Sequence, residues 1–133
     1  MALSYFLYRS SGRLDSFAQD CDDILIEARA RNARLDLTGF LHAEDGIFVQ
    51  WLEGPAAPME EVVALILNDP RHRDVTVFGQ GLIETRQFPG WAMGFSRNDA
   101  ALLFDFLVEQ GANSHDLRAY GDCLHRFLLQ RAA

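Results

Sequence analysis

The sequence lacks several features that identify common classes of protein. No apolar run approaches the roughly 20 residues needed to cross a bilayer, and the N-terminus has no basic region followed by an apolar core. We therefore expect no membrane association and a cytoplasmic location. Cys21 and Cys123 fit no paired-cysteine motif, so both are expected to be reduced. No metal is predicted, because zinc-ligand spacing is missing for all four histidines, His42, His72, His115 and His125.

Positive charge is scarce as well. The chain has 12 Lys and Arg against 19 Asp and Glu, which gives a net charge of -7. Such a charge disfavours non-specific attraction to a phosphate backbone, so we expect no direct nucleic-acid partner. Two local basic clusters remain, at 29–34 and 71–73. Each can hold a phosphate or complement the C-terminal end of a helix, and the sequence leaves both interpretations open.

The residues that are present are typical of one folded domain. With 133 residues, 49% of them hydrophobic, the chain can bury a core but is short for two domains. Alternating apolar residues predict strands, and apolar residues at helical spacing predict helices. The predicted elements are a strand at 2–9, a helix at 15–31, strands at 37–43 and 46–53, a helix between Pro58 and Pro70, strands at 75–83 and 91–95, and helices at 98–110 and from 114 onward.

This order of elements predicts an α+β fold, a ferredoxin-like βαββαβ sandwich with an extra fifth strand. Asp45-Gly46 is the favoured pair for a tight antiparallel turn between the second and third strands. Period-two geometry places Gln50 on the face that the first two helices cover and Trp51 on the opposite face. We expect the helices within 98–133, with Asn98 and Ser114 as N-caps, to cover that opposite face as an attached cap rather than a second domain.

Gln50 is the residue that most needs an explanation. It lies in the middle of an apolar strand, and a buried amide without partners costs a few kcal/mol. Tyr8 lies on the first strand, which neighbours the third in this fold, so the hydroxyl and the amide can meet. Asn32, at the end of the first helix, lies in the same layer, with apolar walls nearby. These donors, acceptors and walls suit a flat heterocycle. The walls are Ile24, Leu25 and Ile66.

Several blocks, in order along the chain, resemble one known family. They are Tyr8-Arg-Ser10, Arg31-Asn32, Leu37-Thr-Gly39, Gly46-Ile-Phe-Val-Gln-Trp-Leu-Glu-Gly54, Asp69-Pro-Arg-His72 and Arg86-Gln-Phe-Pro-Gly-Trp-Ala-Met-Gly94. The match runs from about residue 2 to residue 96, and it resembles the BLUF domains, blue-light sensors that use FAD. The resemblance implies a photosensor domain at 1–97 and a helical output segment at 98–133.

The resemblance also implies roles for the matching residues. Tyr8 would donate an electron to the excited flavin, and Gln50 would bridge Tyr8 to the N5 and O4 edge of the ring. Trp91 and Met93, on one face of the last strand, would relay the change out of the site. Asn32 would hold the carbonyl edge of the ring.

Further residues would bind the cofactor if the resemblance holds. Basic side chains would approach the ribityl and phosphate end, and these are Arg29, Arg31, Arg71 and His72. The full set of expected cofactor-binding residues is Tyr8, Ile24, Leu25, Ala28, Arg29, Arg31, Asn32, Phe48, Gln50, Leu52, Ile66, Asp69, Arg71, His72 and Met93.

The implied function is a blue-light photoreceptor without substrate turnover, because no cysteine, histidine or carboxylate is placed by motif to act on a second substrate. The expected cofactor is FAD, with FMN as the alternative. The signal would pass to the C-terminal helices and to an unidentified protein partner, and we expect a homo-oligomer. Two alternatives remain, a flavin-dependent oxidoreductase on the same scaffold and a ferredoxin-like dimerisation module with an empty pocket.

Overall fold

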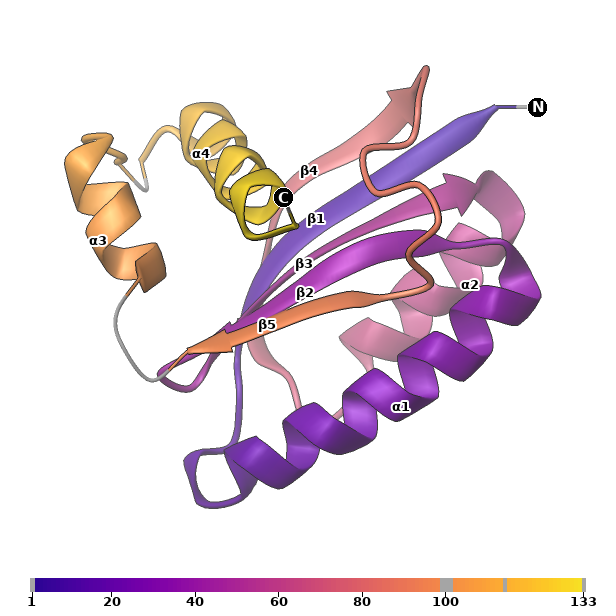
Figure 1. Cartoon of the computed structure of the whole chain (residues 1–133), viewed down its shortest axis with the longest axis horizontal. Helices are drawn as coiled ribbons and strands as arrows, with labels where there is room; N and C mark the ends of the chain where they lie inside the picture. The colour runs from indigo at the N-terminus through magenta and orange to yellow at the C-terminus, as the bar shows by residue number, and fades with distance from the viewer. Residues whose placement is uncertain (1, 99–101, 114, 133) are drawn as a thin grey trace.

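The structure, a computed structural model, describes residues 2–98, 102–113 and 115–132. One five-stranded sheet, in the order β4-β1-β3-β2-β5, has α1 and α2 on one face and α4 on the other (Figure 1). The predicted α+β order is confirmed. The strands are β1 (Leu3–Ser11), β2 (Thr38–Glu44), β3 (Ile47–Pro55), β4 (Arg73–Ile83) and β5 (Gly94–Asn98). The helices are α1 (Phe17–Leu35), α2 (Ala56–Leu67), α3 (Leu102–Glu109) and α4 (Leu117–Ala132), with a 3-10 turn, η1 (Leu14–Ser16), before α1.

The β2–β3 hairpin has the tight turn that the sequence predicts. Glu44 pairs with Ile47, so the loop contains only Asp45 and Gly46. Both loop residues have positive φ, 48° and 79°. A two-residue turn with positive φ at both positions matches the right-handed twist of the two strands and favours Asp-Gly. The turn thereby fixes the register of β3 and the face on which each of its side chains lies.

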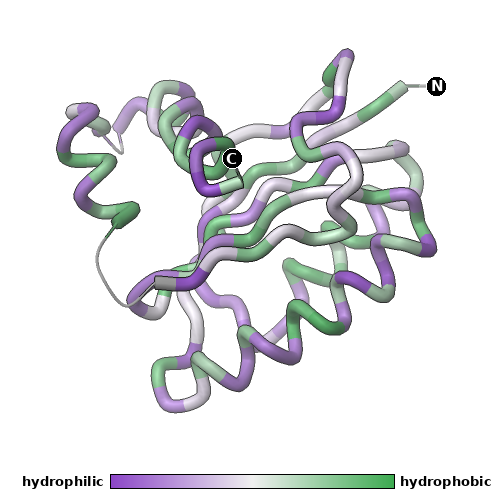
Figure 2. Tube along the Cα trace, viewed as in Figure 1, coloured by the Kyte–Doolittle hydropathy of each residue, from purple (hydrophilic) through white to green (hydrophobic). Residues whose placement is uncertain are grey.

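The sheet separates two apolar cores, as the period-two pattern predicts. Phe6, Tyr8, Phe48 and Leu52 lie in the core beneath α1 and α2. Hydrophobic and hydrophilic residues are interspersed along both helices (Figure 2), and apolar residues of α1 and α2 at helical spacing belong to this core.

The other core lies between the sheet and α4. Trp51 belongs to it, and its indole stacks on the His125 ring of α4 with ring centroids 4.2 Å apart. The prediction that Trp51 points towards the C-terminal helices is therefore confirmed. β3 carries side chains into both cores and joins the two halves of the molecule.

Some predicted bounds are wrong. The last strand begins at Gly94 rather than residue 91. The first helix continues to Leu35, beyond the predicted end at residue 31. Asp36 caps it, with a left-handed φ of 59° and its N–H donated to the Asn32 carbonyl. The Asn98 side chain and Ser114 lie outside the described residues, so their capping roles remain predictions.

No helix in the described ranges is long and apolar enough to cross a membrane. The same ranges contain no group of three or more His, Cys, Asp or Glu side chains that could hold a metal ion. Cys21 and Cys123 are both buried and free.

Candidate functional site

Tyr8 and Gln50 form the centre of the candidate site. They are direct partners in the antiparallel β1–β3 ladder, so their side chains leave the sheet side by side on the face beneath α1 and α2. The Tyr8 hydroxyl donates a hydrogen bond to Gln50 Oε1, and both side chains are buried. Burial raises the pKa of Tyr8 far above its usual value. Tyr8 is therefore protonated at neutral pH and holds the amide oxygen of Gln50.

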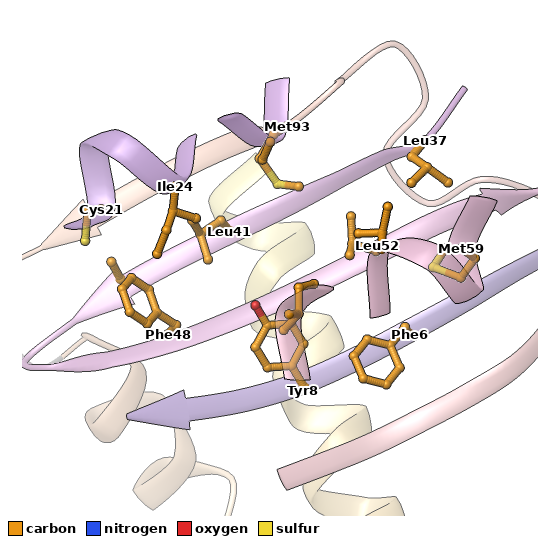
Figure 3. Close-up of a cluster of buried hydrophobic side chains, with 14 residues drawn as sticks. Phe6, Tyr8, Cys21, Ile24, Leu37, Leu41, Phe48, Leu52, Met59 and Met93 are labelled. Carbon is orange, nitrogen blue, oxygen red and sulfur yellow. The ribbon is translucent and has the colours of Figure 1, made fainter. Parts of the chain in front are cut away.

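The other end of the Gln50 amide meets Met93. Gln50 Nε2 donates to Met93 Sδ over 3.6 Å, and a thioether is a weak acceptor. Tyr8 and Met93 enter the same core from β1 and from the segment before β5 (Figure 3). The Gln50 amide is thus held firmly at its oxygen and weakly at its nitrogen.

The backbone around Met93 is fixed by three hydrogen bonds to successive carbonyl groups. Gly39 N–H donates to the Trp91 carbonyl over 3.0 Å. Asn32 Nδ2 donates to the Ala92 carbonyl over 2.7 Å, and Arg29 Nε donates to the Met93 carbonyl over 3.0 Å. β2 and α1 therefore determine where this segment lies, although it belongs to neither of them.

Trp91 lies apart from Gln50, and the prediction that Trp91 and Met93 share a strand face is wrong. Trp91 is 39% exposed, whereas Met93 is 3% exposed. The Trp91 ring packs on Phe40, which belongs to the opposite core, and against Gly94, where a Cβ would come within 1.9 Å of the indole. The residues precede β5, so the period-two pattern of a strand does not apply to them.

A cleft opens beside Gln50, between α1 and the end of α2. Its volume is about 290 Å³, at the lower limit for small-molecule sites. Apolar side chains from the two helices line it together with Gln50, which suits a flat heterocycle with one polar edge. A larger hollow of about 670 Å³ beside α4 contains none of the expected cofactor-binding residues. The expected residues that line the cleft are Ile24, Ala28, Arg31, Gln50, Ile66, Asp69, Arg71 and His72.

The other expected residues do not line this cleft. Leu25 is half-buried at the edge of the core, and the exposed Arg29 bonds to the Met93 carbonyl rather than lying at the cleft. Asn32 is buried, with Nδ2 on the Ala92 carbonyl and Oδ1 accepting from Arg31 Nε over 3.3 Å. Buried core positions are also occupied by Tyr8, Phe48, Leu52 and Met93.

Three residues that line the cleft were not predicted, namely Glu27, Leu65 and Pro70. Glu27 lies on the same face of α1 as Ile24, Ala28 and Arg31, at spacings of three and four residues. Helical spacing could therefore have found it. It was missed because only the apolar and basic residues of that face were considered as ligand contacts.

Arg71 is paired rather than free. Its guanidinium makes three contacts of 2.8 to 3.1 Å with the Asp69 carboxylate, and its Nη1 donates to Glu27 Oε2 over 2.6 Å. These partners raise the pKa of Arg71, while the hydrogen bonds from Arg71 outweigh the effect of burial and lower the pKa of Asp69. Both groups are charged at neutral pH.

His72 does not add positive charge to the cleft at neutral pH. Burial lowers the pKa of His72 to about 4. Its Nδ1 lies 2.7 Å from the Ser10 hydroxyl. The predicted basic cluster at 71–73 therefore offers less positive charge than its sequence suggests.

The known proteins that this chain resembles are blue-light sensors and proteins that contain them. Residues 3–94 match the BLUF family, described as "Sensors of blue-light using FAD". The photoactivated adenylate cyclase subunit beta of Euglena longa is 40% identical over 75 residues, which are 56% of this chain and 9% of that protein. The blue light- and temperature-regulated antirepressor BluF of Escherichia coli is 33% identical over 73 residues, 55% of this chain and 18% of that protein.

Solved structures are similar over most of the chain. The dark-state structure of the BLUF protein BlrB is 32% identical, with a TM-score of 0.76, and the match covers 96% of this chain and 98% of that one. BlsA in its photo-activated state is 25% identical, also with a TM-score of 0.76, over 92% of this chain and 94% of that one. The chain thus spans less than a fifth of these two curated relatives but nearly all of BlrB, including the C-terminal helices.

Proposed function

This chain belongs to the BLUF family of blue-light sensors, and we propose that it is a photoreceptor in which light absorbed by a bound, oxidised flavin rearranges the hydrogen bond between Tyr8 and Gln50. The observation that supports this most directly is the buried Gln50 amide. It accepts from Tyr8 at its oxygen and donates to the Met93 thioether at its nitrogen, and Gln50 lines a cleft. FAD is the first cofactor to test, and FMN the second.

Tyr8 and Gln50 would carry the chemistry. When bound, the flavin supplies a ring that absorbs blue light and then accepts an electron. Tyr8 gives up that electron, and its hydroxyl proton moves along the existing hydrogen bond to Gln50. Both return to Tyr8, so the cycle causes no net oxidation. Gln50 is left rotated or tautomerised, which exchanges a donor for an acceptor at almost unchanged shape.

The change would leave the site through Met93 and β3. Met93 is the second partner of Gln50 and lies directly before β5. Trp51 follows Gln50 in β3 and stacks on His125 of α4. Residues 1–97 would then act as the sensor and residues 98–133 as the output segment, with Trp91 at its edge. A downstream protein, and assembly with further copies of the chain, would receive the signal.

A light-minus-dark absorption spectrum of the flavin-loaded protein tests the proposal. Blue light should shift the flavin band reversibly to the red. Tyr8→Phe and Gln50→Leu should each abolish the shift while flavin stays bound. Tyr5→Phe is the matched control, because Tyr5 lies on the same strand but faces the opposite core, so this variant should photocycle like the wild type.

Two results would reject the proposal. One is a wild-type protein that binds flavin and shows no shift, and the other is a normal photocycle in Tyr8→Phe. Steady consumption of NAD(P)H by the wild type would support the oxidoreductase instead.

A further inference from the structure

Four side chains that carry charge at neutral pH line the cleft. Arg31 and Arg71 are cations, and Glu27 and Asp69 are anions, so their charges cancel. Among the residues that the structure describes, Arg31 makes no ion pair, whereas Arg71 pairs with both carboxylates. A phosphate group entering this cleft meets no net positive charge.

The two carboxylates hold Arg71 in different ways. Asp69 belongs to the same loop and accepts from the backbone N–H of Arg71 as well as from its guanidinium, so the two residues form one local unit. Glu27 comes from α1, across the cleft, and reaches Arg71 Nη1 with one oxygen. Its side chain is 57% exposed, against 17% for Asp69. Glu27 is therefore the partner that can leave Arg71 without disturbing the loop.

We propose that Glu27 is a specificity-determining residue, which competes with the phosphate of a flavin for Arg71 and keeps the affinity for phosphorylated flavins close to that for riboflavin. This inference rests on the proposed flavin cleft. Phosphate is a strong, multidentate acceptor for a guanidinium, but the Nη1 N–H that Glu27 holds becomes available to it only when the Glu27 pair breaks. Riboflavin has no phosphate, so the pair does not affect its binding in this way.

The size of the effect follows from the exposure of the pair. Exposed ion pairs are weak, so releasing Arg71 from Glu27 should tighten FMN binding by about threefold relative to riboflavin. Salt screens exposed charges, so the gain should be largest at low ionic strength. FAD should follow FMN, because it carries phosphate as well.

Dissociation constants of riboflavin and FMN, measured for the full chain by flavin fluorescence at low and high salt, test the proposal. Glu27→Gln should raise the preference for FMN over riboflavin about threefold, and Arg71→Gln should lower that preference below the wild-type value. Glu27→Gln in the Arg71→Gln background should change the preference for FMN little, because the guanidinium for which Glu27 and the phosphate compete is absent. Glu61→Gln is the control, since it removes the same charge from an exposed position outside the cleft lining.

Three results would overturn the role of Glu27. They are an equal effect of Glu27→Gln on both flavins, the same change in preference in Glu61→Gln, and a full effect that persists without Arg71. Any of these together with a reversible red shift in the wild type rejects this inference and leaves the photoreceptor proposal standing. A wild type that binds neither flavin rejects both.

Discussion

Gln50 and Glu53 lie on the same strand, face opposite cores and are both buried, yet they are held very differently. The Gln50 amide has the Tyr8 hydroxyl and the Met93 thioether. The Glu53 carboxylate accepts from the Thr38 hydroxyl, the Trp51 indole and the backbone N–H groups of Gln87 and Phe88, all within 2.7 to 2.9 Å. Moving Gln50 would break one strong hydrogen bond, whereas moving Glu53 would leave four buried or half-buried donors without an acceptor.

This difference shows that β3 holds a weakly fixed side chain at Gln50 while its own position in the sheet is secured by the Glu53 hydrogen bonds. Glu53 attaches Gln87 and Phe88, in the segment between β4 and β5, to β3. Gln87 Oε1 in turn accepts from His125 Nε2 over 3.1 Å. The fixed polar group thus anchors both the segment that ends at Met93 and the helix that covers the opposite core. A change at Gln50 can then act against a rigid frame.

The largest expected effect comes from removing the fixed group. Glu53→Leu should lower the free energy of unfolding by about 3 kcal/mol or more, because its donors become buried and unsatisfied. Urea denaturation measures this loss. Glu84→Ala, at an exposed position of the same segment, should change stability little. A loss below about 1 kcal/mol in Glu53→Leu would contradict the comparison.

The two faces of the sheet also differ in their buried histidines, and the difference should appear as a loss of stability at low pH. His72, on the cofactor face, has its pKa lowered by burial from 6.5 to about 4. On the other face burial also lowers the pKa of His42, but the hydrogen bond to Glu44 opposes the shift. The pKa of His72 in the folded protein lies below its value in the unfolded chain. The contribution of neutral His72 to the free energy of unfolding is therefore complete above pH 6.5 and is lost as the pH falls towards 4. The loss should be about 3 kcal/mol.

Urea denaturation between pH 7 and pH 4 checks the role of His72. His72→Gln should remove most of this loss, since glutamine does not titrate. The wild-type and His72→Gln curves should therefore converge or cross as the pH falls. Parallel curves would show that His72 is not the responsible group.

A smaller effect is expected at the start of α3. The Glu44 carboxylate accepts from the backbone N–H groups of Leu103 and Phe104 at 2.8 to 3.2 Å, so it caps this helix from β2. Glu44→Gln should weaken the cap by about 1 kcal/mol. Faster hydrogen exchange at residues 103 and 104, with β3 unchanged, would be the signature. Glu109→Gln, at the exposed end of α3, should leave that exchange unaltered.

The smallest change in stability is expected for Gln50→Leu, the counterpart of Glu53→Leu. One buried donor, the Tyr8 hydroxyl, loses its acceptor, while leucine fills a similar volume and removes a weakly bonded amide from an apolar core, so the free energy of unfolding should fall by only about 1 kcal/mol. The light response should nevertheless disappear. A loss as large as that of Glu53→Leu would mean that Gln50 is a structural anchor and not a movable group.

Much of the fold and the centre of the site follow from local sequence patterns. The Asp45-Gly46 turn and the alternation along β1 and β3 predict that Tyr8 and Gln50 share a face and that Trp51 points away from it. These predictions are confirmed because turn geometry fixes the register, and strand geometry then fixes every face. Of the three predicted walls, Ile24 and Ile66 follow from helical spacing in the same way, whereas Leu25 does not line the cleft.

The position of Met93 and the charge of the cleft could not be obtained this way. Met93 and Trp91 lie in a segment without repeating backbone geometry, and its place is set by hydrogen bonds from Gly39, Asn32 and Arg29, which are distant in the sequence. The basic clusters left a phosphate site open as one of two interpretations, but Arg71 is paired with Glu27 of α1.

The sequence by itself therefore determined which residues face which core, because strand and helix periods act over a few neighbouring residues. Only the tertiary structure decided which groups meet across the core and how firmly each is held. Those contacts depend on where separate elements pack, and the firm hold on Glu53 and the loose hold on Gln50 arise from partners that the order of residues does not place together.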